Sequence, residues 1–129
     1  MPWTSFDAGD GWFTWTGMPF WVNITNPAGC TWEPSGSIDT SIDYILCPGF
    51  NLVSLPVFST SIVKASDLLG DIDHCSAVYR WKRSVSCASP QSFDAFFSIS
   101  DPVDDFFLIP GHTYWVNVTT GTTWYPPGP

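Results

Sequence analysis

Residues 114–119 read YWVNVT, and the strict alternation of this stretch decides the fold class. Successive side chains of a β-strand point to opposite faces. The alternation therefore places Tyr114 on one face of a strand, and Trp115 and Asn117 on the other. A nearly identical string, FWVNIT, occupies residues 20–25. We expect one face of each strand to lie in the core and the other to face solvent or a partner.

The two strings belong to a longer internal repeat. Setting residue 10 against residue 104 aligns DGWFTWTGMPFWVNIT with DDFFLIPGHTYWVNVT, with seven identities in 16 positions. The match continues in TWEPSG at 31–36 and TWYPPG at 123–128. The first copy lacks the segments that precede the second. We therefore interpret residues 1–47 as the last strands of a preceding repeat plus a connector, and residues 48–129 as one complete repeat module, together forming one compact unit.

The rest of the chain predicts more short strands and one short helix. The predicted strands are NLVSLPVF at 51–58, SAVYRWK at 76–82, SFDAFFSI at 92–99, DDFFLI at 104–109 and TTWY at 122–125. Proline, glycine and aspartate turn signals separate them. In KASDLLGDI, Ser66 is the predicted N-cap of the helix, and Leu68 and Ile72 contribute to its apolar face. The predicted fold is all-β, with short antiparallel strands, one short helix and strands from the tail of a second repeat.

The composition favours a secreted β-protein. Apolar residues make up 44% of the chain and aromatic residues 17%, which is enough to form a core. Charged residues make up only 12%, against about 25% in typical soluble domains. The net charge of -8 argues against nucleic-acid and anionic-lipid partners, and no apolar run is long enough to span a membrane. The N-terminus lacks the basic start of a signal peptide, so we expect a mature or excerpted form.

Four segments resemble a small β repeat module of secreted and cell-surface proteins of archaea and some bacteria. They are PGFNLVSLPV at 48–57, ASDLLGDI at 65–72, VYRW at 78–81 and PGHTYWVNVT at 110–119. The module's pattern is Gly-aromatic-Asn-Leu-x-Ser-Leu-Pro near the start and Gly-x-x-Tyr-Trp-Val near the end. The resemblance implies a β-sandwich-like fold, an extracellular or cell-surface location and no catalytic residues. Such modules usually occur inside long chains, whereas here one unit follows a partial one.

The four cysteines, Cys30, Cys47, Cys75 and Cys87, form no C-x-x-C pair and have no neighbouring histidine cluster, which disfavours zinc. We predict disulfides. Of the three possible connectivities, we prefer Cys30–Cys47 with Cys75–Cys87, because each closes a short loop between predicted strands. The alternative is four small buried thiols in a reducing compartment.

Both repeat tails carry the N-glycosylation pattern N-x-T, at Asn23 and Asn117. Their equivalent positions on the outward face of a strand favour attached glycans in a secreted protein. The alternative is that asparagine and threonine are simply solvent-facing strand residues copied by duplication.

No residue pattern points to a metal, a cofactor or catalysis. The D-x-x-D loops at 7–10 and 101–104, the latter followed by Asp105, have too few oxygen ligands at fixed offsets for a calcium loop, so we interpret them as solvated turns. The chain has two histidines, and it lacks a nucleophile elbow, a zinc-protease motif and a phosphate-binding glycine loop. We predict that it is not an enzyme.

Two functions remain. The first is an extracellular structural subunit that self-assembles into a cell-surface filament or layer by strand or tail exchange, as a homo-oligomer or polymer. The residues predicted to make that contact are Trp12, Phe13, Phe20, Trp21 and Trp32. The alternative is a carbohydrate-binding or adhesion module. Its sugar-stacking rings would be Trp3, Trp15, Trp21 and Trp115.

Overall fold

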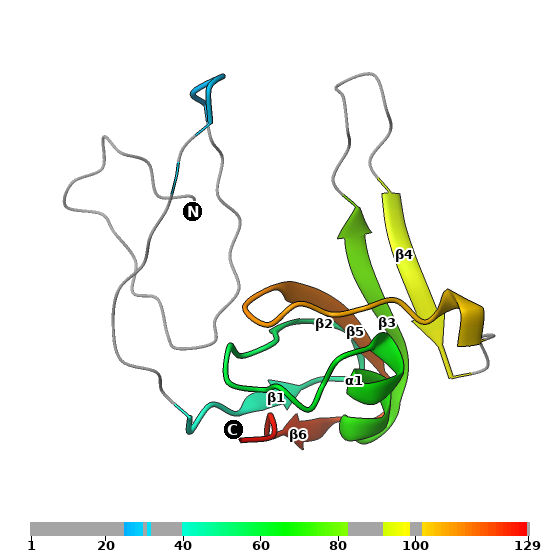
Figure 1. The fold of residues 1–129 in the computed structure, drawn as a ribbon. Coiled ribbons are helices and arrows are strands. Elements are labelled where there is room, and N and C mark those ends of the chain that lie inside the picture. Colours follow the sequence, from blue (N-terminus) through cyan, green and yellow to red (C-terminus); the bar gives the residue numbers. More distant parts are fainter. Residues whose placement is uncertain (1–24, 30, 32–39, 83–91, 99–101, 129) are drawn as a thin grey trace.

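The computed structural model describes residues 25–29, 31, 40–82, 92–98 and 102–128. Over these ranges the regular secondary structure is mostly β-strand, arranged in two antiparallel sheets with one short helix (Figure 1). This confirms the predicted all-β fold class. The strands predicted for the tail of a second repeat lie almost entirely outside the described residues.

The larger sheet has four strands in the order β2-β5-β3-β4. Their bounds are β2 Gly49–Ser54, β3 Cys75–Lys82, β4 Ser92–Phe97 and β5 Thr113–Val118. Pairing between β3 and β5 ends at Tyr79, whereas pairing between β3 and β4 continues to Lys82. The far halves of β3 and β4 therefore project beyond β5 as a two-stranded arm (Figure 1).

The smaller sheet pairs β1, Tyr44–Leu46, with β6, Thr122–Trp124. The Tyr44 and Trp124 rings stack with their centroids 5.4 Å apart, and Trp124 Nε1 donates a hydrogen bond to Asp71 Oδ2 at 2.7 Å. β1 was not among the predicted strands and falls within the stretch assigned to the connector. The domain boundary at residue 47 stays a prediction.

The turn between β1 and β2 gives a physical reason for the PGFN motif. Gly49 has a φ of 103°, a conformation that side chains with a Cβ rarely adopt. The Asn51 side chain then accepts a hydrogen bond from the Cys47 amide at 3.0 Å and donates one to the Cys47 carbonyl at 2.8 Å. The motif thus places β2 directly after β1.

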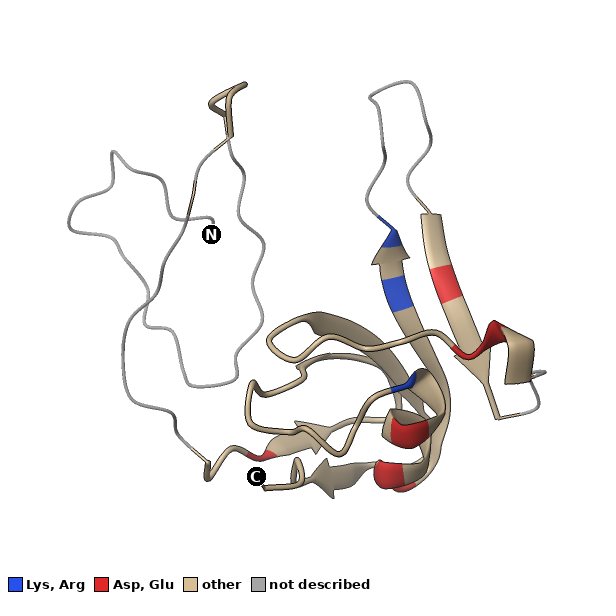
Figure 2. Cartoon of the chain, viewed as in Figure 1, with Lys and Arg blue, Asp and Glu red and all other residues tan. Residues whose placement is uncertain are grey.

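The core lies between the inner face of the larger sheet and the helix α1, Ala65–Asp71. The alternation predicted for β5 is confirmed, since Tyr114, Val116 and Val118 are at most 2% exposed. The Tyr114 hydroxyl accepts a hydrogen bond from the Ile109 amide at 2.8 Å, which satisfies the polar end of a buried ring. β2 and β5 carry no charged residue, as Figure 2 shows.

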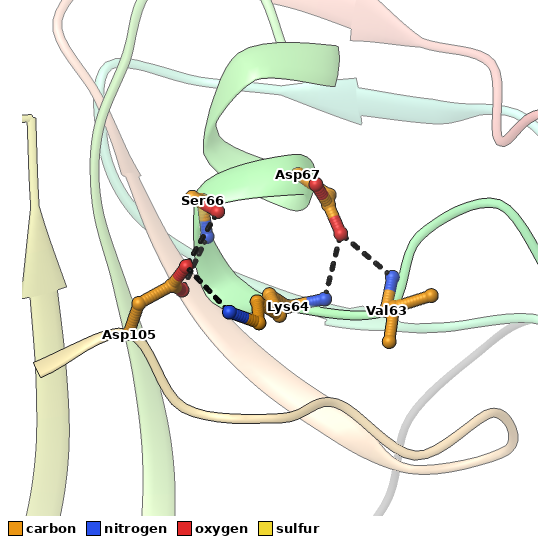
Figure 3. Close-up of polar contacts among 5 residues, drawn as sticks. All are labelled: Val63, Lys64, Ser66, Asp67 and Asp105. Carbon is orange, nitrogen blue, oxygen red and sulfur yellow. Dashed lines mark hydrogen bonds and ion pairs between the residues drawn. The ribbon is translucent and has the colours of Figure 1, made fainter. Parts of the chain in front are cut away.

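The helix begins two residues earlier than predicted. Lys64 occupies the N-cap position, so the prediction of Ser66 there was wrong. Asp67, three residues further on, accepts hydrogen bonds from the Lys64 amide at 2.8 Å and the Val63 amide at 3.0 Å. The Asp105 carboxylate accepts two more, from the Ser66 amide at 2.9 Å and the Ser66 hydroxyl at 2.7 Å (Figure 3). Two carboxylates therefore satisfy donors of the first turn.

The strand predicted over 104–109 is also wrong. Residues Pro102–Asp104 form a 3-10 turn, and the rest contributes only an isolated bridge between Phe107 and Lys64. Asp105 is turned toward the helix, and Phe106 packs into the core. Because the consecutive residues Asp105 and Phe106 both make contacts inside the module, their side chains cannot alternate as in a regular strand.

Candidate interaction surface

The outer face of the larger sheet, opposite the core, carries apolar side chains on all four strands. In antiparallel pairs, residues directly opposite each other project to the same face. The register gives three positions per strand on this face, which we call the aromatic face. They are Phe50, Leu52 and Ser54 on β2, Thr113, Trp115 and Asn117 on β5, Ala77, Tyr79 and Trp81 on β3, and Phe93, Ala95 and Phe97 on β4.

The rings of the aromatic face contact one another across strands. Tyr79 lies between Phe50, at 5.4 Å between centroids, and Phe97, at 5.8 Å. On the arm, Trp81 and Phe93 meet edge to face at 4.6 Å. Contacts of this geometry are favourable beyond the area they bury. The rings therefore form two neighbouring groups on one face, one around Tyr79 and one on the arm, and the sheet fixes both in place.

Several of these rings remain open to solvent. Phe50 is 64% exposed, Phe93 48%, Phe97 43% and Trp81 36%. Single exposed apolar side chains are ordinary on protein surfaces, but a contiguous set indicates a binding surface. The aromatic face is therefore the candidate functional site of the described module.

All the positions of the aromatic face are uncharged. Its polar groups are the Asn117 amide, the Tyr79 hydroxyl, the indole N–H groups of Trp81 and Trp115, and the hydroxyls of Ser54 and Thr113, which are hydrogen-bonded to each other at 3.1 Å. The face therefore offers no charged group that could pair with an ionic ligand. Its chemistry suits an uncharged apolar peptide surface, or a neutral sugar that stacks on rings and bonds to amides and hydroxyls.

The charged residues of the arm alternate with its rings along β3 and β4, so the register places them on the opposite face. Figure 2 shows which strands carry them. Arg80 donates from Nε to Asp94 Oδ2 at 3.2 Å and also from Nη2, while Lys82 Nζ lies 3.2 Å from Asp94 Oδ1. The Arg80 hydrogen bond is the largest cause that lowers the pKa of Asp94, and Lys82 adds to it. Two cations of the YRWKR stretch are thus paired with one carboxylate.

Arg80 also attaches the 106–107 segment to the sheet. Its guanidinium lies 4.6 Å from the centroid of the Phe106 ring, and Nη1 donates to the Phe107 carbonyl at 3.0 Å. This contact covers the inner side of β3, so that the outer side remains the open surface of the strand.

Asn117, the predicted glycosylation site in β5, lies on the aromatic face between Phe50 and Ala77. A glycan attached there would extend over the surrounding rings. Asn23 lies outside the described residues. Glycosylation of both asparagines stays a prediction, and the position of Asn117 implies that its glycan and a protein partner would compete for one surface.

The described cysteines differ in their surroundings. Cys47 is exposed, whereas Cys75 is half-buried, and burial raises the pKa of the Cys75 thiol. Neither is bonded in the structure, and their predicted partners Cys30 and Cys87 lie outside the described residues. The predicted disulfides and their local pairing therefore stay predictions.

Asp105, which follows the acidic pattern at 101–104, has a structural role. Asp105 is directed at the start of α1, with its side chain 8% exposed (Figure 3). Among the described residues, no group of three or more His, Cys, Asp or Glu side chains is placed to hold a metal ion. Asp7, Asp10 and Asp101 lie outside them.

The residues predicted to make the self-association contact lie outside the described part of the chain. They are Trp12, Phe13, Phe20, Trp21 and Trp32. The same holds for Trp3 and Trp15, but Trp115 lies on the aromatic face, half-buried between Leu52 and Tyr79. The sequence reasoning missed the other rings of that face. The alternation of Ala77, Tyr79 and Trp81 in β3 was the signal that could have found them.

Comparison of the chain with protein-family models, curated proteins and solved structures finds no match. The resemblance to the repeat module therefore rests on the quoted motifs alone. Within the described ranges, no helix has the length and hydrophobicity needed to cross a bilayer.

Proposed function

We propose that the chain is a non-catalytic structural module of an extracellular or cell-surface assembly, and that it self-associates through the aromatic face. The observation that carries this proposal is the contiguous, uncharged and partly exposed set of rings on the outer side of β2, β5, β3 and β4. Burial of such rings against another apolar surface is the main favourable contribution to protein association.

The charge distribution supports this choice of surface. The chain carries a net charge of -8, so two copies repel each other over most approaches. The aromatic face has no charge to oppose contact. Within the described module it is a surface on which two copies can meet without bringing carboxylates together.

Sedimentation velocity of the full chain over a wide range of concentration tests this proposal. The mass should rise with concentration in the wild type, and Phe50→Thr with Phe93→Thr should weaken association at least about tenfold. Threonine keeps strand propensity while removing the ring. Ile45→Thr, at an 80% exposed position on β1, is the matched control and should change nothing. A wild type that stays monomeric throughout would refute the proposal.

The predicted glycan on Asn117 has a consequence for this function. Copies that carry it should remain monomeric, because the sugar would cover the rings next to Asn117. Intact mass measured separately on the monomeric and associated fractions of native material tests this exclusion. Equal glycan occupancy of Asn117 in both fractions would contradict it.

A carbohydrate-binding role is a second candidate. It is favoured by one observation, the placement of the Asn117 amide and the Ser54 and Thr113 hydroxyls beside the rings on the same face. Retention of the protein on a panel of neutral polysaccharides, lost in Trp115→Ala, is the expected result. The Ile45→Thr variant is the control. A wild type that is not retained by any of the polysaccharides would remove this candidate.

A further inference from the structure

We infer that the occupant of the aromatic face is the segment 11–32 of a neighbouring copy of this chain. The inference rests on the proposed self-association, and it identifies the part of the neighbouring copy that binds to the aromatic face. Each copy would then carry one aromatic face and one segment, so that association runs head to tail.

The segment matches the aromatic face in chemistry. Residues 11–32 contain no charged residue and are bounded by Asp10 and Glu33. Their large rings are Trp12, Phe13, Trp15, Phe20, Trp21 and Trp32. The chain has two other long uncharged runs, 44–63 and 106–129, and both contribute strands and core residues to the module. By composition, segment 11–32 is equally suited to packing against an apolar sheet.

The position of β5 in the module is already occupied, so the segment cannot take it. The equivalent string in the second copy of the repeat forms β5, which is hydrogen-bonded to β2 on one side and to β3 on the other. Because β5 fills that position, FWVNIT cannot repeat its contacts there. The outer face of the same strands remains open.

The turn near the end of the segment also corresponds to a bend in the second copy of the repeat. The Gly29 amide donates to the Asn26 carbonyl at 2.9 Å, and the Ala28 amide donates to Asn26 Oδ1 at 3.0 Å. In the alignment of the two copies, this turn corresponds to residues 119–121, which connect β5 to β6. Residues 25–29 are all exposed. The described part of the segment, residues 25–29, is thus a turn that is open to a partner.

The chain is long enough to reach a neighbour. The connector between residues 33 and 40, which follows the segment, can extend up to about 25 Å, and this exceeds the width of about 15–20 Å of the four-stranded sheet. Segment 11–32 of one copy can therefore lie across the face of the next without displacing β1 or β2.

Two complementary variants of the full chain test the inference. The segment variant carries Phe20→Ser and Trp21→Ser, and the face variant carries Phe50→Thr and Phe93→Thr. Each alone should be monomeric by sedimentation velocity. Mixed in equal amounts they should form a one-to-one heterodimer, because the segment variant keeps its face and the face variant keeps its segment. Trp3→Ser, which lies outside 11–32, should associate as the wild type does.

The outcomes separate the inference from the proposed function. A segment variant that associates as strongly as the wild type, beside a monomeric face variant, keeps the function and overturns the inference. A mixture that contains only monomers also overturns the inference. A wild type that stays monomeric at all concentrations overturns both. Near-ultraviolet circular dichroism checks that each variant is folded, and the heterodimer itself shows that both remaining surfaces are intact.

Discussion

Substitution of Asp105 should destabilise the module by releasing the start of α1. The carboxylate accepts hydrogen bonds from the Ser66 amide at 2.9 Å and the Ser66 hydroxyl at 2.7 Å (Figure 3). The amide belongs to the first turn, where no helix carbonyl is available as an acceptor. Asp105→Ala leaves both donors without this partner, and the half-buried position of Ser66 limits their replacement by water.

The size of the effect follows from the two bonds. Loss of a capping side chain typically costs about 1 kcal/mol, and a hydrogen bond to a charged group contributes about 1.5–3 kcal/mol. Lys64 Nζ, at 4.0 Å and 43% exposed, adds little. We expect Asp105→Ala to lower the free energy of unfolding by about 2 kcal/mol, with a fall in melting temperature of roughly 10 °C. Asp105→Asn, which keeps one acceptor oxygen, should lose about half as much.

Urea unfolding followed by circular dichroism measures these differences. Asp104→Ala removes the neighbouring carboxylate, which is exposed, and should change stability by less than about 0.5 kcal/mol. In Ser66→Ala, the cost of a subsequent Asp105→Ala substitution should be smaller, because one of the two bonds is already gone. Equal stability of Asp105→Ala and Asp104→Ala would refute the assignment of Asp105 as a capping residue.

Three further predictions concern other described residues. Asp94→Asn should cost about 1 kcal/mol at pH 7, the upper range for an exposed ion pair with Arg80. Because the pKa of Asp94 is lowered in the folded state, this contribution is present above about pH 4 and should vanish as the pH falls through the folded pKa; a difference that persists at low pH in urea unfolding would contradict it. Tyr114→Phe should cost about 1–2 kcal/mol, since it removes the acceptor of a 2.8 Å bond at a buried ring, and unchanged urea unfolding would argue against that bond. In reduced, folded protein, iodoacetamide should label exposed Cys47 about tenfold faster than Cys75, whose pKa is raised by burial; peptide mass mapping that finds equal rates would count against this difference.

Much of the strand content could be predicted from local pattern. β2 to β6 were each anticipated. The side chains of β2, β3 and β5 alternate, β4 is rich in aromatic residues, and turn residues separate the strands; β2 ends at Ser54, earlier than the predicted 51–58. β1 was missed, because three residues are too few to show a period. It is stabilised by pairing and ring stacking with β6, which lies far away in the sequence. Pairing between distant segments is not encoded in local alternation.

Two errors show where long-range contacts override local signals. The 104–109 stretch has strand-like composition, yet Asp105 is held by the start of α1 and Arg80 covers the Phe106 ring. Ser66 is a good capping residue by type, yet Lys64 takes the N-cap position because Asp67 and Asp105 both satisfy donors nearby. In both cases a residue distant in sequence supplies the partner that decides the local conformation.

The aromatic face could be predicted only in part. Alternation placed Trp115 and Asn117 on the outward side of one strand, but the rows of rings arise from the register of four strands that are not in chain order. Arg80 also obscured the pattern of β3, because a charged residue on the core side is unusual. It is accommodated there by Asp94 and Phe106.

Hydroxyl-radical footprinting of the full chain, at a dilute and a concentrated condition, tests the central claim most directly. It reports the solvent exposure of individual side chains in the unmodified protein. The account predicts that Phe50 and Phe93 are oxidised at the dilute condition and protected at the concentrated one, while Ile45 is oxidised equally in both. Equal oxidation of Phe50 and Phe93 at the two conditions, or protection of Ile45 to the same degree, would contradict self-association through the aromatic face.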